Sequence, residues 1–116
     1  LVEDDDLVRT VARTMLEQTL GYHVFSVADA DAALALLKND VAIDLLFSDV
    51  MMPGTNGREL MQKARLLRPG LKVLLTSGFA DSAIVGSGKL EADVQLLPKP
   101  YPLNELARKV REVLDK

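Results

Sequence analysis

The chain has 116 residues, of which 48% are hydrophobic and 27% charged, with a formal net charge of −3 and no cysteine. These values predict one globular domain, exclude disulfides and thiolate metal sites, and give no sign of a nucleic-acid surface. No apolar stretch approaches the roughly 20 residues of a membrane span, and the absence of cysteine fits a reducing compartment, so we expect a cytoplasmic protein. The first residue is not Met, so we expect the chain to be an excerpt.

Strand and helix patterns alternate along the sequence. In chain order we predict a strand end at 1–3 whose beginning is missing, a helix capped by Asp6 and running to about Leu20, a short β segment at 22–27, a helix capped by Asp29, a strand at 45–48, a helix at 57–67, a strand at 72–76, a weak helix at 80–90, a strand at 94–97 and a last helix with Pro102 in its first turn. That makes five strands and five helices.

The central strands are apolar on both faces, as in Leu45-Leu46-Phe47. Such runs are typical of a parallel sheet covered by helices on both sides. Right-handed crossovers then bring the carboxyl ends of all strands to one edge. We therefore expect Asp4, Asp49, Thr76 and Lys99 to share that edge, with the Asp49 side chain facing solvent there.

These residue types favour chemistry on a phosphoryl group with a divalent cation. Mg²⁺ binds one or two carboxylates and keeps several waters, so Asp4 and Asp49 are the candidate ligands. Glu3 can hold a coordinated water, and the backbone carbonyl of Met51 can add a neutral oxygen. A carboxylate can also attack phosphorus to give an acyl phosphate, and Asp49 stands alone on its loop.

The remaining two residues of the edge suit the phosphoryl group itself. Lys99 would pair with the incoming phosphate or with Asp49, and the Thr76 hydroxyl would bond a phosphate oxygen. Taken singly, each residue also has an ordinary structural explanation: a turn-forming aspartate, a surface lysine, a β-branched strand residue. The only histidine, His23, lies away from the predicted edge and is expected to be structural.

The sequence resembles the receiver domain of two-component response regulators over essentially its whole length. Four pieces, in order and at strand ends, carry the resemblance: Val2-Glu3-Asp4-Asp5, Asp49-Val50-Met51-Met52-Pro53-Gly54 with Gly57, Leu75-Thr76-Ser77-Gly78, and Pro98-Lys99-Pro100. The resemblance implies one receiver domain over 1–116, with a flavodoxin-like α/β fold, a doubly wound parallel sheet of strand order 2-1-3-4-5.

The resemblance also implies a role for each residue of the site. Asp49 would accept a phosphoryl group from the phosphohistidine of a partner histidine kinase or histidine phosphotransfer protein. Asp4 and Asp49 would ligate Mg²⁺, for which Mn²⁺ can substitute, with Met51 giving its backbone carbonyl and Glu3 acting through water. Thr76 would be the switch hydroxyl. Lys99 would be the family's lysine, and its bond to Pro100 would be cis.

One position departs from the family pattern. The family carries an aromatic side chain on the last strand that swings inward on phosphorylation, and here that position is Leu96. Leucine cannot make the same switch, so the relay would run through Tyr101, Phe79 or the backbone. The responsive surface would be formed by the fourth helix, the last strand and the last helix.

Three classes of function stay open at this stage. A phosphoacceptor signalling domain, which turns over only its own phosphoryl group, is favoured. A metal-dependent phosphatase with an aspartyl phosphate would need an acid where Met51 stands. A receiver-like or flavodoxin-like binding module that is never phosphorylated would not need the whole set of site residues. Whether the domain is free-standing or part of a hybrid sensor kinase, and whether it forms a homodimer, is also open.

Overall fold

A parallel sheet with helices on both faces organises the molecule. The computed structural model describes residues 1–39, 41–50, 56–77 and 95–115. Its elements in chain order are α1 (Asp6–Thr14), the π-helix η1 (Met15–Thr19), α2 (Ala30–Lys38), β1 (Leu45–Asp49), α3 (Gly57–Leu67), β2 (Lys72–Ser77), β3 (Gln95–Pro98) and α5 (Leu103–Leu114). None of the helices in these ranges combines the length and the apolar character needed to cross a membrane.

The strand order agrees with the prediction. β2 lies between β1 and β3 and pairs with both in parallel. Val2 forms parallel bridges to Ser48 on one side and to Val27 on the other, so the amino-terminal segment lies between β1 and the segment before α2. The order 2-1-3-4-5 is therefore confirmed, although the first two strands appear only as these single bridges.

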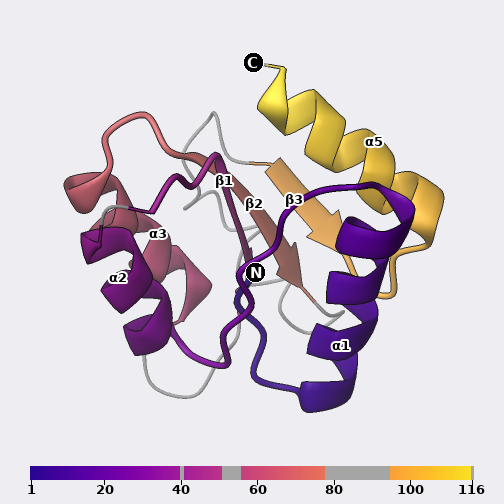
Figure 1. Ribbon diagram of the computed structural model, residues 1–116, viewed down its shortest axis with the longest axis horizontal. Helices are drawn as coiled ribbons and strands as arrows, with labels where there is room; N and C mark the ends of the chain where they lie inside the picture. Colours follow the sequence, from indigo (N-terminus) through magenta and orange to yellow (C-terminus); the bar gives the residue numbers. More distant parts are fainter. Residues whose placement is uncertain (40, 51–55, 78–94, 116) are drawn as a thin grey trace.

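Helices cover both faces of the sheet, with α2 and α3 on one side and α1 and α5 on the other (Figure 1). Each face has its own hydrophobic cluster. Neighbouring strand residues alternate between the clusters: Leu46 packs on the α2/α3 side and Phe47 on the α1/α5 side. This alternation explains why the strands are apolar throughout, since both faces are buried.

The helix boundaries follow local capping chemistry. The Asp29 carboxylate accepts the Ala32 N–H at 2.8 Å and caps α2 as predicted. Asn56 caps α3 in the same way. Gly70, with φ of 86°, lies after α3 in the left-handed region that favours glycine.

The start of the first helix differs from the prediction. Asp5, not Asp6, is the cap: its backbone is extended, and its carboxylate accepts two N–H groups of the first turn. Asp6 is already helical. The α-helix ends at Thr14 and gives way to a π-helical turn rather than continuing to Leu20.

Smaller differences affect the other elements. Asp49 is the last residue of β1 rather than the first residue after it. Pro102 is the cap of α5 instead of lying in its first turn. The bond between Lys99 and Pro100 is cis, as predicted. The helix expected at 80–90 lies outside the described residues.

Candidate functional site

The polar residues of the site gather where the parallel strands end. Asp49 ends β1 and is directly paired in register with Thr76 on β2. Lys99 follows β3, and its backbone N–H donates to the Ser77 carbonyl at 2.7 Å. Glu3 comes directly after the bridge residue Val2. These residues therefore lie at one edge of the sheet, as predicted.

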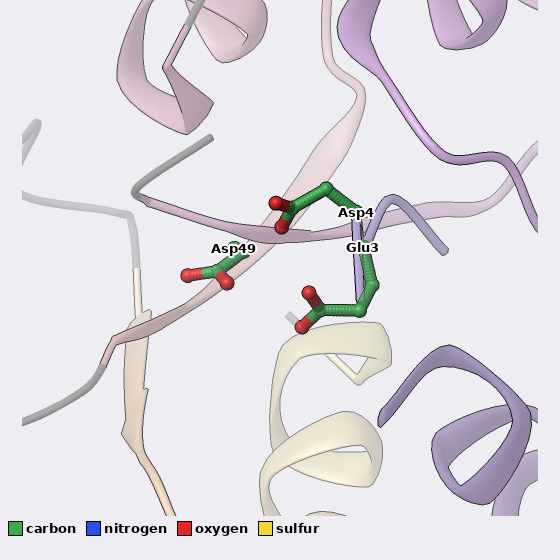
Figure 2. A group of neighbouring side chains, drawn as sticks. All are labelled: Glu3, Asp4 and Asp49. Atoms are coloured by element: carbon green, nitrogen blue, oxygen red, sulfur yellow. The ribbon is translucent and has the colours of Figure 1, made fainter. Parts of the chain in front are cut away.

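Three carboxylates lie close enough to share one cation. Glu3, Asp4 and Asp49 each offer an oxygen, and these oxygens lie within 4.8 Å of one another. In Figure 2 the three groups surround a common space. Glu3 is 3% exposed and Asp49 5% exposed, whereas Asp4 is exposed. The expectation that Asp49 faces solvent is therefore wrong, and Lys99 and Glu3 are among the side chains beside its carboxylate.

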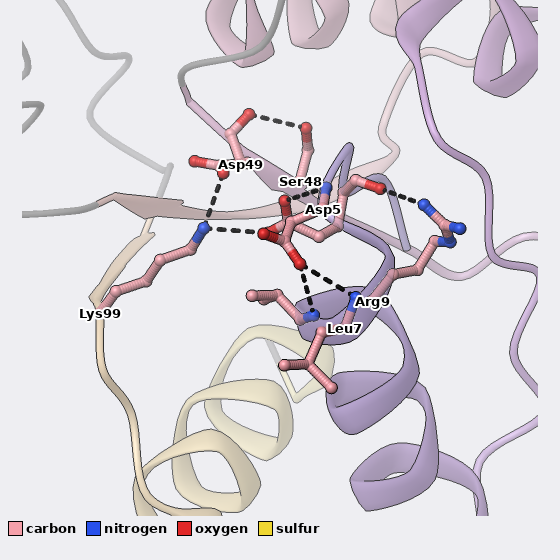
Figure 3. Close-up of polar contacts among 8 residues, drawn as sticks. Asp5, Leu7, Arg9, Ser48, Asp49 and Lys99 are labelled. Atoms are coloured by element: carbon pink, nitrogen blue, oxygen red, sulfur yellow. Dashed lines mark hydrogen bonds and ion pairs between the residues drawn. The ribbon is translucent and has the colours of Figure 1, made fainter.

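Lys99 links two of these acids. Its Nζ lies 2.7 Å from Asp49 Oδ2 and 2.9 Å from Glu3 Oε1 (Figure 3). Burial works against the charge on this ammonium, but the hydrogen bonds to Asp49 and Glu3 outweigh it and raise the pKa of Lys99 above its usual value. Burial also raises the pKa of Glu3, by more than the bond from Lys99 lowers it. Lys99 is therefore a fixed positive charge beside the candidate acceptor.

The four consecutive acids at the start of the chain have separate tasks. Glu3 Oε2 accepts the Asp5 N–H at 3.1 Å, and the Asp5 carboxylate caps α1. Asp6 pairs with Arg9. Within the described residues, no hydrogen bond or ion pair involves the Asp4 carboxylate. Asp4 is therefore the acid of this run that is available to a ligand.

Thr76 supplies an independent sign that an acceptor belongs at this edge. Its Oγ1 is buried and, among the residues described, has no hydrogen-bond partner. A buried hydroxyl without a partner costs about 1–3 kcal/mol. A phosphoryl oxygen arriving beside Asp49 would provide the acceptor.

The charges of the site fit a divalent cation. When ionised, three carboxylates with one ammonium leave two negative charges, and oxygen ligands of this kind suit Mg²⁺ or Mn²⁺. Among the described residues, the ligands would be Asp4 and Asp49, with Glu3 beside them. Met51, the predicted carbonyl ligand, lies outside the described residues.

Two residues with a bearing on the site were missed from the sequence. Gly57, noted only as part of a motif, opens α3 against β1: a Cβ on it would lie 2.1 Å from the Asp49 carbonyl oxygen. Arg9 donates to the Glu3 carbonyl at 2.9 Å. The sequence signal for Arg9 was its position three residues after Asp6, the spacing of a helical ion pair.

The two candidate relay residues lie on opposite faces of the sheet. Leu96 is half-buried and packs with the α2/α3 cluster. Tyr101 belongs to the α1/α5 cluster, where its ring lies 5.9 Å from that of Phe47. Burial raises the pKa of Tyr101 to about 12. Phe79, the other aromatic candidate, lies outside the described residues.

Comparison with known proteins points to one family. The family model described as Response regulator receiver domain matches residues 1–111. Sensor kinase CckA of Brucella abortus (strain 2308) is 36% identical over the whole chain, which spans 12% of that protein. Response regulator receiver protein CpdR of the same strain is 32% identical over 98% of the chain and 93% of that protein. The crystal structure of the receiver domain from the hybrid histidine kinase CckA has a TM-score of 0.79 at 38% identity, covering 97% and 94% of the two chains.

Proposed function

Because this chain belongs to the response regulator receiver domain family and is thus a phosphorelay signalling domain, we propose that Asp49 is its phosphoacceptor and that Asp4 and Asp49 hold a Mg²⁺ ion. The observation that carries the proposal is the buried Asp49 carboxylate, bonded to Lys99 at 2.7 Å and within 4.8 Å of two further acids. Glu3 would act through a coordinated water, and the Met51 carbonyl would complete the ligands. Residues 1–116 would form one receiver domain.

The transfer would be a substitution at phosphorus. An Asp49 oxygen forms the new bond while the bond from phosphorus to the donor's imidazole nitrogen breaks, and that nitrogen keeps the electron pair. A bound divalent cation would neutralise the phosphoryl oxygens and the acceptor carboxylate. Lys99 holds Asp49 in place and offers a positive charge, and Thr76 gives the new phosphate a hydrogen bond. The domain would turn over no substrate other than its own phosphoryl group.

The donor would be a histidine kinase or a histidine phosphotransfer protein. Support comes from relatives that are response regulator and sensor kinase proteins. We place the domain, together with its donor, in the cytoplasm. We propose that the domain itself binds neither nucleic acid nor a membrane.

The conformational response would begin at Thr76. Phosphorylation adds about two negative charges and strong acceptors, which would draw the unpaired hydroxyl toward Asp49. Leu96 cannot supply the aromatic part of the response. Tyr101 is placed to do so, because it follows Lys99 by two residues and its ring lies against Phe47 on the acceptor strand. The surface that changes would include β3 and α5.

The direct test is chemical phosphorylation. Acetyl phosphate with Mg²⁺ should add one phosphoryl group, located at Asp49 by peptide mass spectrometry. Asp49→Asn should abolish the addition. Asp44→Asn is the matched control, since Asp44 is an exposed aspartate just before the same strand. Mn²⁺ should substitute for Mg²⁺, and a chelator should stop the reaction.

Two results would contradict the proposal. One is equal phosphoryl uptake by the wild type and Asp49→Asn, which would place the acceptor elsewhere. The other is steady hydrolysis of a phosphoester such as p-nitrophenyl phosphate by the folded protein, which would favour a phosphatase.

A further inference from the structure

Arg9 forms a clamp across the acidic turn that leads from the sheet into α1. Its guanidinium donates through Nη1 to the Glu3 carbonyl oxygen at 2.9 Å, drawn in Figure 3, and through Nη2 to the Asp6 carboxylate. The side chain is 22% exposed, so most of it lies against the protein. Residues 3 and 6 are thereby tied together, and Asp4 lies between them.

Asp4 depends on this turn for its position. Its exposed carboxylate has no hydrogen bond or ion pair within the described ranges, so only its backbone fixes where it points. That backbone is anchored on the sheet side by the Glu3 N–H, which donates to Val27 at 3.1 Å. It is anchored on the helix side by the Asp5 cap. Two side chains join the anchored ends: Glu3, whose carboxylate accepts the Asp5 N–H at 3.1 Å, and Arg9, which reaches from the Glu3 carbonyl to the Asp6 carboxylate.

We propose that Arg9 is a positioning residue that holds the turn from Glu3 to Asp6 so that Asp4 stays beside Asp49, and that it thereby sets the affinity of the site for a divalent cation. The inference rests on the proposed function, because it assumes that Asp4 and Asp49 bind Mg²⁺. Groups that orient metal ligands without touching the metal typically change its affinity by about 10–100-fold.

The charge of Arg9 acts in the opposite direction. A guanidinium near the acids weakens their attraction for a cation, so charge alone predicts tighter Mg²⁺ binding when it is removed. This effect is small here, because the Arg9 charge is already paired with Asp6, whose side chain is 90% exposed to screening solvent. Losing the position of Asp4 should therefore weaken Mg²⁺ binding by more than losing the Arg9 charge strengthens it.

Two substitutions separate these effects. Arg9→Lys keeps the charge but lacks the fork that reaches two acceptors at once, whereas Arg9→Met removes both. Arg13→Met is the matched control, since Arg13 lies one turn further along α1 in an exposed ion pair with Glu17. Mg²⁺ affinity is measured by isothermal titration calorimetry, and folding by circular dichroism. The phosphorylation rate from acetyl phosphate is measured at saturating Mg²⁺.

Both Arg9 variants should bind Mg²⁺ about tenfold more weakly, and Arg13→Met should match the wild type. At saturating Mg²⁺ both Arg9 variants should be phosphorylated at close to the wild-type rate, because Arg9 does not touch the reacting carboxylate. If Arg9→Met proves too unstable to measure, Arg9→Lys alone decides the outcome.

Wild-type affinity in Arg9→Lys, or tighter binding in Arg9→Met, overturns the inference and leaves the proposed function standing. A wild-type protein that binds no Mg²⁺ and accepts no phosphoryl group overturns both.

Discussion

Alanine at position 57 should force the start of α3 away from β1. A Cβ on Gly57 would lie 2.1 Å from the Asp49 carbonyl oxygen and 2.9 Å from its carbonyl carbon. Ordinary contact begins near 3.4 Å, so the helix or the strand must move by about 1 Å. Both contacts are to backbone, which cannot rotate away as a flexible side chain can.

The stability effect is a balance of two terms. Alanine in place of glycine within a helix gains about 0.5–1 kcal/mol, whereas an extra methyl group in a packed site costs about 1–3 kcal/mol. We expect the clash to dominate and the free energy of unfolding to fall by about 1–2 kcal/mol. A displacement of about 1 Å at a reacting group can lower a rate about 100-fold, and we expect such a loss in phosphorylation of Asp49.

Urea unfolding and intact-protein mass after acetyl phosphate treatment measure the two effects. Gly70→Ala is the control: Gly70 has φ of 86°, and a Cβ there would meet nothing within 4 Å. It should lose about 1 kcal/mol of stability through backbone strain and keep its phosphorylation rate. A Gly57→Ala protein with wild-type stability and wild-type phosphorylation would refute the reasoning.

The other predictions concern charge, ionisation and capping. Lys99→Met leaves two buried carboxylates without their ammonium and should lower the free energy of unfolding by about 3 kcal/mol at pH 7, and the loss should shrink on acidification as Glu3, whose pKa burial raises, takes up a proton. Tyr101 should ionise near pH 12, as followed by absorbance in a Tyr22→Phe background, where it is the only tyrosine. Since an unfolded tyrosine ionises near pH 10, this residue makes stability fall as the pH rises from about 10 to 12. Asp29→Ala should lose about 1 kcal/mol by uncapping α2, whereas Asp31→Ala should change little.

Each of these has a result that would contradict it. For Lys99, that result is an unfolding curve at pH 7 equal to that of the wild type. For Tyr101, it is a titration midpoint near 10 while circular dichroism still reports the native fold. For Asp29, it is a free energy of unfolding of Asp29→Ala equal to that of the wild type, or an equal loss of stability in Asp31→Ala.

The strand order and the edge shared by Asp49, Thr76 and Lys99 could be predicted from the sequence, because they depend on alternation and on the handedness of crossovers. Those rules act over whole elements and tolerate errors of a residue or two. The same reasoning could not tell which of the neighbouring acids caps α1, because Asp5 and Asp6 are chemically identical and the choice depends on which has an extended backbone.

The contacts of individual side chains were harder to predict. The π-helical turn of η1 has no sequence pattern of its own. The burial of Asp49 depends on the chain that surrounds it, and the approach of Gly57 to its carbonyl appears only when α3 is placed against β1. The structure shows the bond from Lys99 to Asp49, one of the two pairings predicted for this lysine, and the pairing with a phosphoryl group stays a prediction.

The ammonium of Lys99 contacts one acid 96 positions earlier in the sequence and another 50 positions earlier. The proposed site is therefore assembled from segments that are far apart in the sequence. A nascent polypeptide that has not yet reached Lys99 contains Glu3 and Asp49 but lacks the ammonium that pairs with them. A fragment that ends before Lys99, or one that begins after Asp49, lacks part of the site. The proposed acceptance of a phosphoryl group therefore requires the segment that carries Lys99 to be made and placed beside Glu3 and Asp49.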